Sequence, residues 1–113
     1  MITIYHNPRC SKSRNCKAML DDLGEEIKVI QYLKDPFTFD SLKNVIAMLK
    51  IEPLELIRKN EQIWKEHYKG KELNNEELIQ AMVENPKLIE RPIVVKDGKA
   101  VVARPMEKVE EIL

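Results

Sequence analysis

The periodicity of the apolar residues changes twice along this chain, and these changes constrain the fold more than any other feature of the sequence. Residues 2–5 predict a short strand, residues 12–23 a helix that ends before Gly24, and residues 27–32 a second strand. Ser11 is available to cap the helix. A strand, a helix and a strand within about thirty residues form a βαβ unit, whose strands should be parallel with a right-handed crossover.

The middle of the chain is predicted to be helical. Thr38 is placed to cap a first helix, and residues 53–57 form a short second helix that opens on a proline. Asn74 and Glu77 have the spacing of a capping box before a further helix, which Asn85-Pro86 should end. The buried face of the first of these helices is expected to carry Leu42, Val45, Ile46 and Leu49.

The last part of the chain returns to strands. Two apolar runs, residues 93–95 and 100–102, flank Asp97-Gly98, a pair typical of a tight β-hairpin. Pro105 is expected in the first turn of a final helix. The order β-α-β, helical insert, β-β-α predicts an α/β, thioredoxin-like fold with a mixed sheet. We expect one domain over residues 1–113, with the insert at about residues 38–85.

The charge balance excludes several function classes. Lys plus Arg and Asp plus Glu each total 19, so the net charge is zero, and no basic excess points to nucleic acid or an anionic membrane. The apolar runs are too short to span a bilayer. Met1 leads directly into the first predicted strand without a signal peptide. We therefore expect a cytoplasmic protein, without membrane or nucleic-acid partners, that acts as a monomer.

Cys10 lies where the first predicted strand passes into the first helix. The unpaired N–H groups and partial positive charge of a helix N-terminus favour both a thiolate and an incoming oxyanion. Arg9, Lys12 and Arg14 add positive charge within four residues, and His6 is near enough in sequence to form a hydrogen bond there. This setting predicts a cysteine whose pKa is lower than that of a free thiol.

Cys16 is expected to play a different part. In a continuous helix it would lie about 9 Å along the axis from Cys10 and on another face, so a disulfide would require local unwinding. We expect Cys16 in or near the core. A phosphatase-type Cys-x5-Arg loop is excluded because Cys16 stands where the arginine is needed. The two cysteines match no zinc pattern with His6 and His67, so neither a metal nor another bound cofactor is expected.

Four segments resemble one enzyme family, the glutaredoxin-linked arsenate reductases of the ArsC/Spx-like branch of the thioredoxin fold. They are YHNPRCSKSRN at residues 5–15, ELIRKN at residues 55–60, NPKLIERPIV at residues 85–94 and ARP at residues 103–105. The segments occur in the family's order and extend over nearly the whole chain. The resemblance is therefore far more specific than a single motif.

The resemblance implies a mechanism. Cys10 would attack arsenate and form a thiol–arsenic adduct, glutathione would join the adduct as co-substrate, and glutaredoxin would resolve it with release of arsenite. Arg58, Arg91 and Arg104 fall on the oxyanion-binding arginines of the family. Such a role suits arginine, whose planar donor fork keeps its charge.

Other residues are expected to support this site. Pro92 resembles the cis-proline of thioredoxin folds, which precedes the third strand. The complete supporting set is His6, Lys12, Ser13, Arg14 and Pro92.

The sequence is also compatible with two other functions. The chain departs from the commonest family pattern, with Ser11-Lys12 in place of Gly-Thr after the cysteine, which leaves its substrate selectivity open. A general glutathione-dependent thiol-disulfide reductase would use the same scaffold. Spx-type transcriptional regulators, which bind RNA polymerase, also share it, but their redox switch has Cys-x-x-Cys, whereas here the second position is Ser13.

Overall fold

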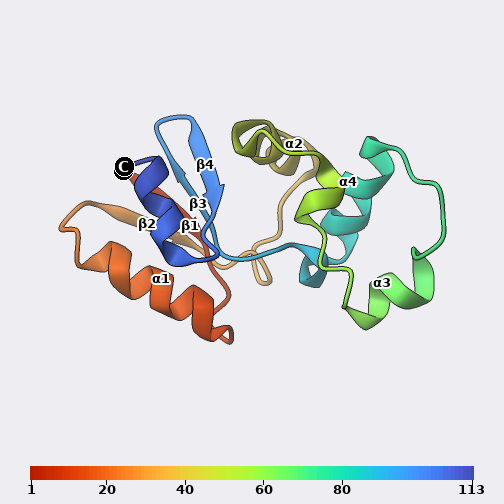
Figure 1. Cartoon of the computed structure of the whole chain (residues 1–113), viewed down its shortest axis with the longest axis horizontal. Helices are drawn as coiled ribbons and strands as arrows, with labels where there is room; N and C mark the ends of the chain where they lie inside the picture. The colour runs from red at the N-terminus through yellow and green to blue at the C-terminus, as the bar shows by residue number, and fades with distance from the viewer. The chain divides into compact units, whose positions relative to one another are not determined.

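The computed structural model describes all 113 residues, and their contacts divide the chain into two compact units. The first unit contains Met1–Asp35 and Arg91–Leu113, and the second contains Pro36–Glu90. The predicted insert at residues 38–85 lies wholly inside the second unit. Each unit has its own secondary structure, as the coloured ribbon shows (Figure 1).

The first unit is built on a four-stranded mixed sheet. The strands are β1 (Ile2–Tyr5), β2 (Ile27–Ile30), β3 (Ile93–Lys96) and β4 (Lys99–Val102), in the order β2-β1-β3-β4. β1 pairs in parallel with β2 and antiparallel with β3, and β3 pairs antiparallel with β4. This is the predicted β-α-β plus β-β-α arrangement, so the α/β thioredoxin-like fold is confirmed.

Helix α1 (Ser11–Asp21) and the C-terminal 3₁₀ helix η3 (Met106–Glu111) pack on the sheet around one core (Figure 1). Because side chains alternate along a strand, Ile2 and Ile4 of β1 point to the same face, and Val94 lies opposite Ile4 on β3. The buried members of this core are Ile2, Ile4, Cys16, Leu20, Val94, Ala103, Val109 and Ile112. The expected burial of Cys16 is therefore confirmed.

The hairpin that joins β3 and β4 also follows the prediction. Asp97 and Gly98 both have positive φ, 51° and 77°, as a two-residue turn between twisted strands requires. The peptide bond between Arg91 and Pro92, just before β3, is cis, as expected for Pro92.

Several predicted boundaries are corrected. β2 ends at Ile30 rather than at residue 32, and α1 spans Ser11–Asp21 rather than residues 12–23. The N-cap of α1 is Cys10, so Ser11 is the first helical residue and not the cap. Pro105 has an extended backbone, with φ −71° and ψ 166°, and precedes the last helix instead of lying in its first turn.

The second unit is helical. Its elements are α2 (Phe39–Leu49), η1 (Pro53–Leu56), α3 (Gln62–His67), α4 (Asn75–Glu84) and η2 (Pro86–Leu88). Thr38 and Asn74 cap α2 and α4 through reciprocal capping boxes, as their spacing predicted. Helix α3 was not predicted, because it is only six residues long and Trp64 is its single buried residue, too little for a periodic signal.

None of the helices combines the length and the apolar character needed to cross a bilayer.

Candidate active site

Cys10 occupies the junction between β1 and α1, and short hydrogen bonds define its backbone. Its N–H donates to the Asn7 carbonyl at 3.0 Å, and its own carbonyl accepts the first helical hydrogen bond from Arg14 N–H at 3.0 Å. The thiol is half-buried. Cys10 is therefore the N-cap of α1, the position at which a side chain faces the unpaired N–H groups of the first turn.

The surroundings of Cys10 lower its pKa below the ordinary value of a thiol. Burial acts in the opposite direction, but the backbone N–H of Ser13, the guanidinium of Arg91 and the backbone N–H of Lys12 together outweigh it. The thiol makes no capping hydrogen bond of regular geometry, yet these N–H groups lie close enough to favour the charged sulfur. The direction of this pKa shift agrees with the one that the sequence predicts, and the catalytic role of Cys10 stays a prediction.

The cation that acts on the sulfur differs from those expected. The sequence pointed to Arg9, Lys12 and Arg14, whereas the principal charged side chain is that of Arg91, eighty-one positions further along the chain. The Arg14 side chain instead donates from Nη1 to the Pro8 carbonyl at 2.9 Å. Lys12 contributes through its backbone N–H.

Arg91 reaches the sulfur because of the strand order. β3 lies beside β1 with Ile93 opposite Tyr5, so the residues just before β3 lie next to the loop that leaves β1. The Nε atom of Arg91 is buried and has no hydrogen-bond partner. Buried donors are nearly always paired, so this arginine has donor capacity for an anionic ligand beside the thiolate.

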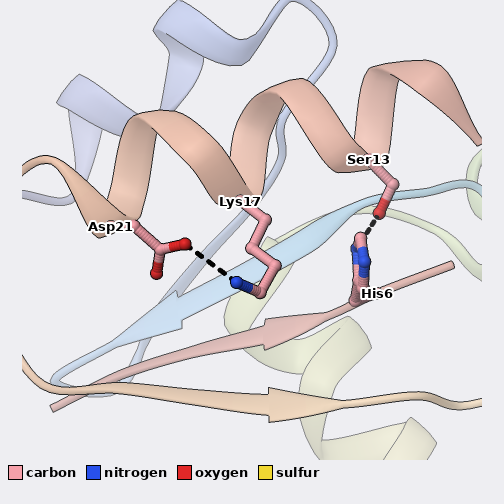
Figure 2. A network of polar contacts seen from close by, with 4 residues as sticks. All are labelled: His6, Ser13, Lys17 and Asp21. Carbon is pink, nitrogen blue, oxygen red and sulfur yellow. Dashed lines mark hydrogen bonds and ion pairs between the residues drawn. The ribbon is translucent and has the colours of Figure 1, made fainter. Parts of the chain in front are cut away.

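His6 and Ser13 form a buried pair beneath the cysteine loop. Figure 2 shows Ser13 on α1 pointing toward His6 at the end of β1, with 2.6 Å between His6 Nδ1 and Ser13 Oγ. The Asn7 N–H donates to the same hydroxyl oxygen at 3.1 Å. Burial lowers the pKa of His6, and the charges of Lys17 and Arg14 lower it further, so the ring is neutral at neutral pH. His6 therefore orients the loop through hydrogen bonding, not as a cation beside the thiolate.

Asn7 was absent from the predicted site residues, although it fixes the cysteine loop. Its side-chain oxygen accepts from Arg9 N–H at 3.0 Å, its carbonyl accepts from Cys10 N–H, and its N–H donates to Ser13. The signal for this role was the dipeptide Asn7-Pro8, because asparagine before proline is typical of a turn closed by its own side chain.

Lys12 and Arg104 line the same cavity, which has a volume of about 510 Å³ and lies beside the first turn of α1. The first unit thus brings together six of the predicted residues at or near Cys10: His6, Lys12, Ser13, Arg14, Arg91 and Arg104.

Arg58 belongs to the second unit. Its guanidinium forms ion pairs with Glu61 at 3.1 Å and with Glu90 at 3.3 Å, and its backbone N–H donates to the Leu88 carbonyl at 2.7 Å. Its predicted part in oxyanion binding stays a prediction.

Cys16 is chemically unlike Cys10. It is fully buried in the core beneath α1, and burial raises its pKa to about 11. A thiol of this kind is a poor nucleophile at neutral pH. No group of three or more His, Cys, Asp or Glu side chains is arranged to bind a metal ion.

Comparisons with known proteins agree on one family. The sequence profile of the ArsC family matches residues 5–112. The chain is 46% identical to the uncharacterized protein YfgD of Escherichia coli (strain K12), over 99% of this chain and 96% of that protein. It is 42% identical to a protein of the same strain named arsenate reductase, over 99% of this chain and 80% of that protein.

A solved structure agrees with these sequence matches. The structure named arsenate reductase from Vibrio cholerae superposes with a TM-score of 0.95 at 44% identity, covering 99% of this chain and 97% of that one.

The first prediction concerns the cation at the sulfur. Replacing Arg91 with Gln should raise the pKa of Cys10, because it removes both a donor and a charge that favour the thiolate. The rate of iodoacetamide alkylation against pH measures this pKa. Arg9→Gln removes an equal charge from the exposed part of the loop and serves as the matched control. A larger pKa change in Arg9→Gln than in Arg91→Gln would contradict the assignment.

The second prediction concerns His6. Folding lowers the pKa of His6. As the pH falls below about 6.5, the unfolded chain therefore takes up a proton at this residue more readily than the folded protein does. This contribution to stability is complete above that pH and decreases below it. The free energy of unfolding in urea should therefore decline between about pH 6.5 and 5, and His6→Gln should show a smaller decline.

An NMR titration of the His67→Gln variant, which keeps His6 as its one histidine, gives a direct check. A midpoint at or above the ordinary value of about 6.5 would refute the neutral-ring interpretation.

Proposed function

This chain belongs to the ArsC family, and from that membership together with the Cys10–Arg91 pair we propose that it reduces arsenate to arsenite. The observation that carries the proposal is a cysteine with a lowered pKa beside an arginine whose buried Nε has no partner. Such a pair offers a nucleophile and a fixed donor for the negative oxygens of the group it attacks.

In the proposed first step, the Cys10 thiolate attacks arsenic. A sulfur–arsenic bond forms while one arsenate hydroxyl takes up a proton from solvent and leaves as water. Arg91 stabilises the negative charge on the remaining oxygens, and the N–H groups at the start of α1 face the same sulfur. Arg104 is proposed as a second oxyanion-binding arginine.

The electrons come from external thiols in the proposal. A glutathione thiolate forms a second sulfur–arsenic bond as another hydroxyl of the adduct takes up a proton from solvent and leaves as water. A glutaredoxin thiolate then attacks the glutathione sulfur, the two form a disulfide, and the electron pair of the broken sulfur–arsenic bond stays on arsenic, which becomes As(III). Water hydrolyses the remaining bond to Cys10 and releases arsenite with the thiolate. This chemistry requires the reduced thiols of the cytoplasm.

An internal disulfide is disfavoured by the state of Cys16. This thiol is fully buried with a pKa raised to about 11, so it is a poor attacker of an adduct on Cys10. Bringing the two sulfurs together would also break hydrogen bonds of α1, each worth about 1 kcal/mol net. The core position of Cys16 thus supports regeneration by an external thiol.

The third prediction tests the reaction. With arsenate, glutathione and glutaredoxin, the wild type should produce arsenite and Cys10→Ser should produce none. Arg91→Ala should lower the rate on the order of a hundredfold, because a desolvated donor to the oxyanion is lost. Arg9→Ala, a change of the same kind in the exposed part of the loop, should retain nearly full activity.

Two results would redirect the proposal. If the wild type reduces mixed disulfides of glutathione but forms no arsenite, the general thiol-disulfide reductase is the correct function. Equal rates in Arg91→Ala and Arg9→Ala would move the oxyanion site away from Arg91.

The fourth prediction tests regeneration. Cys16→Ser should keep most of its turnover with glutathione and glutaredoxin, because the proposed cycle uses no second thiol of this chain. A variant that stops after one turnover, together with a Cys10–Cys16 disulfide in the oxidised wild type by mass spectrometry, would show that the internal route is used.

A further inference from the structure

We propose that the cavity of about 510 Å³ beside the first turn of α1 binds the peptide thiol that regenerates Cys10, with Glu107 receiving its α-ammonium group. The inference rests on the proposed function and deepens it by assigning a subsite to the thiol co-substrate. Three properties of the cavity support this assignment: its walls, its charges and its size.

The walls of the cavity belong to the elements that hold the reactive sulfur. One wall carries Lys12 and Asn15, which lie three residues apart and therefore on one face of α1. The backbone N–H of Lys12 is one of the groups that lower the pKa of Cys10. The cavity thus begins within one helical turn of the thiolate.

The opposite wall is formed by the segment from Ala103 to Glu107. Ala103 N–H donates to the Pro92 carbonyl at 2.9 Å, and Pro92 follows Arg91, the arginine at the sulfur. This wall is therefore hydrogen-bonded to the segment that carries Arg91. A ligand in the cavity would lie beside the adduct on Cys10.

The charges that line the cavity match a peptide thiol such as glutathione. Lys12 and Arg104 are positive, Glu107 is the single acidic lining residue, and Asn15 offers an amide. Glutathione has two carboxylates, one α-ammonium group and two peptide bonds. Glu107 therefore has a counterpart in the α-ammonium group and Lys12 in one carboxylate of the ligand, which leaves Arg104 for the arsenate oxygens.

The size of the cavity also fits. Small-molecule sites have volumes of about 300–1,000 Å³ and combine apolar walls with a few polar groups. Here Pro105 and Met106 supply apolar surface between the charged residues. A small neutral thiol would occupy little of this volume and would form no ion pair with the charged lining residues.

The test measures thiol exchange without arsenate. Cys10 is first converted to its mixed disulfide with thionitrobenzoate. A thiolate then attacks the Cys10 sulfur, a new S–S bond forms, and thionitrobenzoate leaves with the electron pair. The colour of the released thionitrobenzoate gives the rate of the exchange. The probes are glutathione and N-acetylglutathione, which differ in the α-ammonium group. The measured quantity is the ratio of their rate constants.

Glu107→Gln should lower this ratio roughly fivefold, because only glutathione loses an ion-pair partner. Glu110→Gln is the matched control, since Glu110 is an exposed acidic residue of the same helix and does not line the cavity. A general change in electrostatic attraction would also lower the ratio, because N-acetylglutathione has one more net negative charge than glutathione and gains more from the loss of a carboxylate; Glu110→Gln measures this contribution.

A ratio in Glu107→Gln within twofold of the wild type, or an equal fall in Glu110→Gln, would overturn the proposed subsite. Because arsenate is absent from this measurement, its outcome is independent of the reductase activity. A chain that shows the fivefold fall but forms no arsenite would keep the subsite and lose only the proposed function.

Discussion

The hydroxyl of Ser13 holds the end of β1 and the start of α1 together, and the geometry of the site depends on it. Ser13 is fully buried, its Oγ lies 2.6 Å from His6 Nδ1, and it accepts a hydrogen bond from Asn7 N–H. The backbone N–H of the same residue faces the sulfur of Cys10. Ser13 therefore holds the cysteine loop through its side chain and favours the Cys10 thiolate through its backbone N–H.

The sheet brings to Cys10 a charged side chain that the cysteine loop does not provide. A helix N-terminus favours an anion, but a half-buried thiol also loses solvation, and here burial is the largest single influence on Cys10. The opposing side chain is that of Arg91, placed by the antiparallel pairing of β1 with β3. The pKa of Cys10 therefore depends both on the N-terminus of α1 and on the pairing of β1 with β3.

The sequence predicted most of what depends on local chemistry. The β-hairpin at Asp97-Gly98, the capping box of Asn74 and the burial of Cys16 followed from spacing and residue type. Helix α3 was missed because Trp64 alone gives no periodicity. The charges near Cys10 were misassigned because distance along the chain says nothing about which cation a strand pairing brings to the sulfur. The family resemblance named Arg91, but geometry was needed to place it at Cys10.

The burial of Cys16 has a consequence for how the folded state can be observed. The native protein exposes one reactive thiol, whereas the unfolded chain exposes two. The second thiol is sealed by the same residues that form the core of the first unit, Ile4 and Leu20 among them. Modification of Cys16 therefore requires that this core opens. The rate at which Cys16 reacts with a thiol reagent thus reports the unfolding of the core of the first unit.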